Sequence, residues 1–339
     1  SPAPVSVNAR HAVIVFLARE LGRSMSVLDD VVKTYDLRGL VGSQLTPEIM
    51  VALGTAFAKF VSADRVIIGH DMRPSSPEFA ESFAQGVNNL GKGVVMLGLC
   101  STDQTYFASG TLNLPAVMFT ASHNPASYNG IKFSNAGATG ISFETGLSEI
   151  KKLAESFIDD PLPRRERNVE NYDSLSDYAE YLKSLVQIPE NSMRVVVDAA
   201  NGMGGHTVPA VLSDLELDEM YFDLDGTFPN HEANPLDPKN LVDLQNRVLE
   251  TQADLGIAFD GDADRCFIVD ELAKPVNPSA IASIVAKREV QRVGGSPYVL
   301  HNLLTSRFFE EYLREMGAKT VRTKVGHSLI KDEMRRTNA

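Results

Sequence analysis

The chain has 339 residues, more than a single hydrophobic core usually supports, so we expect two or more domains. Its hydrophobic content of 43% and charged content of 22% are ordinary for a soluble globular protein. The net charge of -12 argues against a nucleic-acid-binding protein, because nucleic-acid-binding surfaces are basic.

The cysteine content and the N-terminal segment bear on the compartment. The two cysteines, Cys100 and Cys266, are too few for a disulfide framework and fit a reducing cytoplasm. The longest apolar run near the N-terminus, from Ala12 to Ala18, is too short to span a bilayer. We therefore predict a cytoplasmic protein without nucleic-acid or membrane partners. The sequence does not fix its oligomeric state.

Short β-branched runs alternate with longer amphipathic stretches, a pattern typical of α/β proteins. The first unit is predicted to hold strands at 65–69, 94–98 and 116–120 and helices at 77–90 and 103–112. The second is predicted to hold strands at 194–198, 219–223 and 255–259 and helices at 205–212 and 238–250. The third is shorter, with strands at 298–301 and 319–322 and helices at 306–316 and 328–335.

Repetition of this unit predicts three similar mixed α/β domains around a central cleft. Proline-containing segments at 159–163 and 272–275 are the expected linkers. The predicted divisions are an N-terminal extension at 1–28, domain 1 at 29–160, domain 2 at 161–272 and domain 3 at 273–339.

The strongest chemical signal is an acidic loop after the predicted strand at 255–259. Asp260, Asp262 and Asp264 alternate on this loop, so their oxygens can converge on one hard cation such as Mg²⁺. An EF-hand is the first alternative, but it requires glycine where Arg265 stands and helices on both sides. A solvated acidic turn is the second, yet apolar strands on both sides favour a metal site.

A second polar cluster follows the strand at 116–120. Ser122 and His123 come directly after the apolar run, and an Asn-Gly turn brings Lys132 back on the next strand. Each residue alone has an ordinary structural interpretation, as a turn, hydrogen-bonding or exposed residue. Together, beside a magnesium loop, they form a set that could hold a phosphoryl group on the serine hydroxyl.

These stretches resemble the α-D-phosphohexomutase family of phosphomannomutases and phosphoglucomutases. The resemblance lies in Thr120-Ala121-Ser122-His123-Asn124-Pro125 with Asn129-Gly130-Ile131-Lys132, and in Asp260-Gly261-Asp262-Ala263-Asp264-Arg265. Tyr35-Asp36-Leu37-Arg38-Gly39, Gly69-His70-Asp71-Met72-Arg73 and Gly326-His327-Ser328-Leu329-Ile330-Lys331 match further family loops, all in family order. A loop with Phe228 and His231 also resembles the family, and we interpret His231 as structural.

The resemblance implies a mutase acting on hexose phosphates, of mannose or glucose, through a phosphoserine and a hexose 1,6-bisphosphate. It implies that Ser122, Asp260, Asp262 and Asp264 hold Mg²⁺ and that Arg265 holds the transferring phosphoryl group. His123 and Lys132 are the two candidates for proton transfer. Tyr35, Arg38 and His327 are the implied substrate-binding residues.

The chain also departs from the family pattern. A sugar-reading Gly-Glu-x-Ser-Gly-His segment and a phosphate-clamping fourth domain are expected after the Gly-His-Ser loop and are absent before Ala339. A domain 3 lysine of many relatives is also missing, where His301-Asn302-Leu303-Leu304 stands. We therefore expect residues 1–339 alone to turn over poorly. The alternatives are a truncated non-catalytic relative that binds a partner and, more remotely, a phosphatase.

Overall fold

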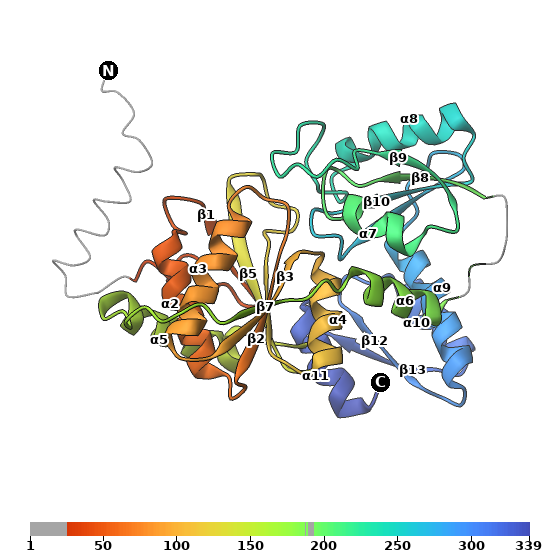
Figure 1. Ribbon diagram of the computed structural model, residues 1–339. Helices are drawn as coiled ribbons and strands as arrows, with labels where there is room; N and C mark the ends of the chain where they lie inside the picture. The colour runs from red at the N-terminus through yellow and green to blue at the C-terminus, as the bar shows by residue number, and fades with distance from the viewer. Residues whose placement is uncertain (1–25, 187, 189–192) are drawn as a thin grey trace, which may run out of the picture.

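The computed structural model describes residues 26–186, 188 and 193–339, which form three α/β units grouped around a common centre (Figure 1). This confirms the predicted three mixed α/β domains. Most of the predicted extension at 1–28 lies outside the described residues. Leu28, however, is fully buried in the core of the first unit, so packing of that unit already includes the end of the predicted extension.

The first unit is built on a sheet of seven described strands in the order β1-β5-β4-β2-β3-β7, with β6 paired to β5. Strands β4, β2, β3 and β7 are parallel, whereas β5 runs antiparallel to both β1 and β4. The strands are β1 (Leu37–Leu40), β2 (Arg65–His70), β3 (Gly93–Leu99), β4 (Ala116–Phe119), β5 (Tyr128–Asn135), β6 (Thr139–Gly140) and β7 (Val169–Asn171).

Helices cover both faces of this sheet. Alternate side chains of β2 enter different cores: Val66 and Ile68 pack with α2, α3 and α5, whereas Ile67 packs on the face that α4 covers. Both faces are apolar because both are buried, as parallel sheets require. The helical segments are α2 (Pro47–Phe60), α3 (Ser76–Asn89), α4 (Thr102–Leu112), the short η1 (Phe143–Leu147) and α5 (Ser148–Asp159).

The second unit has a four-stranded sheet in the order β11-β10-β8-β9. Its middle strands are the predicted strands at 194–198 and 255–259, and α8 packs against both of them, β8 and β10. Its elements are α6 (Leu175–Leu185), β8 (Arg194–Asp198), α7 (Gly204–Val211), β9 (Glu216–Met220), η2 (Pro238–Leu241), α8 (Val242–Thr251), β10 (Leu255–Phe259) and β11 (Cys266–Asp270).

The third unit pairs β12 with β13 in parallel, and α9 and α10 pack against each other over a small core. Its elements are α9 (Pro278–Val293), β12 (Tyr298–Asn302), α10 (Arg307–Glu315), β13 (Lys319–Thr323) and α11 (His327–Thr337). Helix α11 also contacts β6 of the first unit, so the third unit packs against the first through this helix. Among the described helices, none has the length and apolarity needed to cross a bilayer.

One predicted strand boundary is wrong. The strand predicted at 219–223 is β9 at 216–220, because Tyr221 adopts a left-handed backbone with φ of 57° and ends the strand. The first sheet also receives a strand from beyond residue 160, where the division between domains 1 and 2 is predicted. Strand β7, at 169–171, pairs in parallel with β3, so the first sheet continues beyond that boundary.

Candidate active site

The serine loop connects β4 to the antiparallel strand β5 at one edge of the first unit. Ser122 is 4% exposed and adopts a left-handed backbone with φ of 51°. Its N–H donates to the side-chain Oγ1 of Thr120 at 2.9 Å, which stabilises this uncommon backbone conformation. The loop therefore presents the serine hydroxyl in one defined direction.

The acidic loop joins the antiparallel strands β10 and β11, so the predicted flanking strands are confirmed. Ligand oxygens of Asp260, Asp262 and Asp264 lie within 4.8 Å of one another. Asp260 and Asp262 are fully buried, and the Oδ1 atom of Asp262 has no hydrogen-bond partner. Three converging carboxylates with a buried, unpartnered oxygen fit a hard divalent cation such as Mg²⁺.

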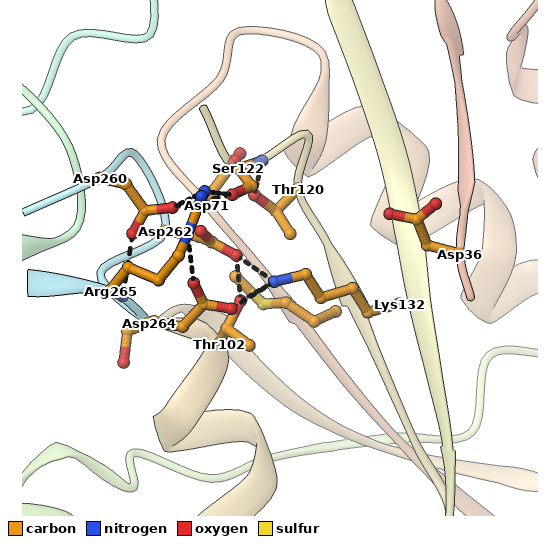
Figure 2. A network of polar contacts seen from close by, with 12 residues as sticks. Asp36, Asp71, Thr102, Thr120, Ser122, Lys132, Asp260, Asp262, Asp264 and Arg265 are labelled. Carbon is orange, nitrogen blue, oxygen red and sulfur yellow. Dashed lines mark hydrogen bonds and ion pairs between the residues drawn. The ribbon is translucent and has the colours of Figure 1, made fainter. Parts of the chain in front are cut away.

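The two loops meet at the serine hydroxyl, although they are separated by more than a hundred residues (Figure 2). Ser122 Oγ donates to Asp260 Oδ2 at 2.8 Å, and Arg265 Nη2 donates to the same Oγ at 2.6 Å. Arg265 also pairs with Asp260 and contacts His123 Nδ1 at 2.7 Å. The hydroxyl of the first unit thus lies between an acid and a guanidinium of the second.

Lys132 extends from β5 toward the acidic loop, as Figure 2 shows. Its Nζ lies 2.6 Å from Asp262 Oδ2 and 2.6 Å from Asp264 Oδ2. Thr102, the first residue of α4, donates its hydroxyl to the same Asp262 oxygen. The first unit therefore supplies both a cation and a hydroxyl to carboxylates of the second.

Burial and neighbouring charges raise the pKa values of Asp260 and Lys132 and lower the pKa of His123. Burial, together with Asp262 and Asp264, raises the pKa of Asp260 despite Arg265. Burial acts against the charge of Lys132, but Asp262 and Asp264 outweigh it and raise its pKa. For His123, burial and the charges of Arg265 and Arg38 lower the pKa, which favours the neutral imidazole.

Of the predicted site residues of the first two units, all except the buried Asp260 and Asp262 line one cleft of about 670 Å³. Arg38 on β1 donates to Asn124 Oδ1 at 2.5 Å and so contacts the serine loop. Tyr35 donates to the Val325 carbonyl of the third unit at 3.4 Å. His327 is the first residue of α11, but its side chain lies outside the described residues. The cleft is lined by Lys33, Thr34, Tyr35, Asp36, Arg38, Asp103, Tyr106, Ser122, His123, Lys132, Asp264, Arg265 and Lys331.

Comparison with known proteins identifies the family. Models of "Phosphoglucomutase/phosphomannomutase, alpha/beta/alpha" domains I, II and III match residues 29–157, 176–273 and 277–339. The chain belongs to the phosphoglucomutase/phosphomannomutase family. This confirms the resemblance seen in the sequence motifs.

Individual members of the phosphoglucomutase/phosphomannomutase family agree with this assignment. A phosphomannomutase of Escherichia coli is 33% identical over 318 residues, covering 91% of this chain and 70% of its own length. A phosphoglucomutase of Neisseria meningitidis is 32% identical over 322 residues, covering 93% of this chain and 68% of its own length. The crystal structure of a family protein from Burkholderia thailandensis superposes with a TM-score of 0.84 and 30% identity, covering 93% of this chain and 70% of the other.

Three further residues belong to this site without a predicted role: Thr102, and Arg73 and Lys331 from the sequence motifs at 69–73 and 326–331. Thr102 bonds to Asp262, and Lys331 of α11 lines the cleft with its Nζ 4.5 Å from the Tyr106 ring centre. Arg73 lies buried behind the serine loop. The parallel pairing of β2 with β4 was a usable signal for Arg73, because it brings the two loops to the same sheet edge.

Proposed function

We propose that the protein is a phosphohexomutase that interconverts hexose 6-phosphate and hexose 1-phosphate, of mannose or glucose. The observation that carries the proposal is the position of Ser122 Oγ, 2.8 Å from Asp260 Oδ2 and 2.6 Å from Arg265 Nη2. The names of its relatives, phosphomannomutase and phosphoglucomutase, support the same reaction.

In the proposed reaction, Ser122 carries the phosphoryl group. A sugar hydroxyl oxygen attacks phosphorus, the bond between phosphorus and Ser122 Oγ breaks, and a hexose 1,6-bisphosphate forms. The sugar hydroxyl gives its proton to a base, for which His123 and Lys132 are the two candidates in the cleft. The bisphosphate reorients, Ser122 Oγ attacks the other phosphorus, and the bond between that phosphorus and its sugar oxygen breaks. The base returns its proton to this sugar oxygen, so the sugar leaves as the isomer.

The remaining residues have electrostatic and binding roles in this proposal. Arg265 keeps its guanidinium on the transferring group, where a planar fork suits phosphate oxygens. Asp260, Asp262 and Asp264, with an oxygen on Ser122, would hold Mg²⁺, which supplies positive charge opposite the transferring phosphoryl group. Tyr35, Arg38 and His327 are the proposed sugar-phosphate contacts.

Intact-protein mass spectrometry tests the proposal. After incubation with glucose 1,6-bisphosphate and Mg²⁺, we expect an adduct of about 80 Da, one phosphoryl group, on Ser122. Added mannose 6-phosphate or glucose 6-phosphate should remove the adduct, and Ser122→Ala should never acquire it. A non-catalytic relative would gain no adduct, and a phosphatase would release inorganic phosphate without isomerised sugar. A cytoplasmic location and a lack of nucleic-acid and membrane partners stay predictions from composition.

A further inference from the structure

Arg73 is a charged side chain placed where charges are costly. It follows β2 and is 1% exposed, and a buried guanidinium is tolerated only when its donors are satisfied. Its Nε forms an ion pair with Asp71 Oδ2 at 3.2 Å, and its backbone N–H donates to Asp71 Oδ1 at 3.0 Å. The other donors of the guanidinium all point at the serine loop.

Four backbone carbonyls of that loop converge on this one guanidinium. Nη2 donates to the carbonyls of Ser122 at 2.9 Å and Asn124 at 2.7 Å. Nη1 donates to those of Pro125 at 2.8 Å and Tyr128 at 3.0 Å. Because the fork is planar and rigid, these bonds fix the four carbonyls relative to one another.

The arrangement sets the direction of the serine hydroxyl. The Ser122 carbonyl oxygen accepts from Arg73 and also lies against Gly261. A β-carbon added at Gly261 would lie 2.4 Å from this oxygen. With its carbonyl held and its φ at 51°, Ser122 has a fixed direction of its Cα–Cβ bond, and the contacts of Oγ with Asp260 and Arg265 then hold the hydroxyl. Arg73 itself is absent from the lining of the cleft, so it does not meet the substrate there.

The second unit closes over the same guanidinium. The Phe228 ring centre lies 5.2 Å from the Arg73 guanidinium carbon, a cation–π distance. Gly226 packs so closely that an added β-carbon would lie 2.6 Å from the Arg73 α-carbon. The loop carrying these two residues therefore contacts Arg73, which in turn holds the serine loop of the first unit.

We propose that Arg73 is a positioning residue, which fixes the reactive geometry of Ser122 by binding four carbonyls of its loop under the cover of Phe228. This inference rests on the proposed function, in which Ser122 carries the phosphoryl group. It predicts an effect on the rate of phosphoryl transfer without an effect on substrate affinity.

The test uses Arg73→Lys, which keeps the charge but cannot form the fork. Its matched control is Arg65→Lys, at an exposed arginine that begins β2. The first readout is the rate of Ser122 phosphorylation by glucose 1,6-bisphosphate, followed by quenching and intact mass. At saturation we expect a loss on the order of 100-fold for Arg73→Lys, the cost of misplacing a reacting group by about 1 Å. The concentration of glucose 1,6-bisphosphate that gives half the maximal rate should stay unchanged in Arg73→Lys. In Arg65→Lys, both the maximal rate and this concentration should equal those of the wild type.

The second readout is amide hydrogen exchange, which needs no activity. Loop N–H groups of Asn124 and Tyr128 bond within the loop, to the carbonyls of Ala121 and Pro125. Peptides covering 121–130 should exchange faster in Arg73→Lys. Peptides from the third unit, and those of the second unit outside the loop of Gly226 and Phe228, should keep their wild-type rates. Faster exchange throughout the chain would assign Arg73 a general structural role and overturn the proposal.

The outcomes separate the two proposals. If wild-type protein gains no phosphoryl group, the proposed function fails, and hydrogen exchange alone decides the role of Arg73. If wild type and Arg73→Lys gain the phosphoryl group at equal rates, the proposed positioning role of Arg73 is wrong, whereas the proposed function is supported. Should Arg73→Lys not fold, Phe228→Leu decides by the same readouts, with an expected slowing of roughly 2- to 5-fold from the lost cation–π contact. An unchanged rate in that variant would overturn the proposal.

Discussion

Gly261 of the acidic loop lies directly against the backbone of Ser122, so that a β-carbon at Gly261 would come within 2.4 Å of the Ser122 carbonyl oxygen. Backbone atoms cannot move aside as the end of a flexible side chain can. The serine loop and the acidic loop therefore approach each other only because residue 261 is glycine.

The first prediction is that Gly261→Ala separates the two loops. The distance between Ser122 Oγ and Asp260 should increase, and phosphorylation of Ser122 should slow on the order of 100-fold. Gly110→Ala in α4 is the control, because nothing lies within 4 Å of its added β-carbon. Comparable phosphorylation rates in the two variants would show that the contact between the loops does not position the serine.

The second prediction concerns the cation. Mg²⁺ that binds the folded acidic loop must stabilise the protein by mass action, so the thermal midpoint should rise with Mg²⁺ concentration and fall again with EDTA. Asp262→Asn should abolish this rise, since Asp262 offers a buried oxygen without a hydrogen-bond partner. The exposed Glu250→Gln should behave as wild type. A midpoint insensitive to Mg²⁺ in the wild-type protein would argue against a metal at this loop.

The sequence predicted the two loops because their signals are local. Strands such as β4 and β10 stand out as apolar runs, and the polar residues that follow them lie within a few positions. The roles of Thr102, Arg73 and Phe228 were not predicted because their partners are far away in the sequence: Thr102 bonds to a residue 160 positions away. Strand β7, with the sequence Val-Glu-Asn, is short and exposed at a sheet edge, so it carries no apolar pattern.

The third prediction is a pH dependence of stability from His231. His231 Nε2 lies 2.8 Å from Asp198 Oδ2, which is buried, and the structural role inferred for His231 agrees with this contact. Burial opposes the charged imidazole, but the hydrogen bond and charge of Asp198 outweigh it and raise the pKa of His231. A raised pKa in the folded state adds stability that is fully present below the unfolded value near 6.5 and is lost as the pH rises through the folded value.

The His231→Gln variant tests this sign. Its loss of stability, measured as the shift in urea midpoint relative to wild type, should be largest near pH 5.5 and smaller at about pH 8.5, above the unfolded pKa. Lost packing on Tyr221, whose ring contacts His231 edge-on, contributes equally at both pH values. A deficit that does not change with pH would mean that only this packing matters.

The fourth prediction addresses how the first two units are held together. The Thr102 hydroxyl donates to Asp262, and the Thr102 N–H donates to the Asp262 carbonyl at 3.2 Å, so the start of α4 contacts the acidic loop twice. Thr102→Val keeps the shape and the backbone bond but removes the donor to a buried carboxylate. Hydrogen bonds to charged groups contribute about 1.5–3 kcal/mol, and we expect a loss of that size in the free energy of unfolding.

Urea denaturation in EDTA measures this loss without the metal contribution, and Thr102→Ser, which keeps the hydroxyl, should recover most of the loss. If serine and valine destabilise equally, the methyl group of Thr102 rather than its hydrogen bond supports the contact.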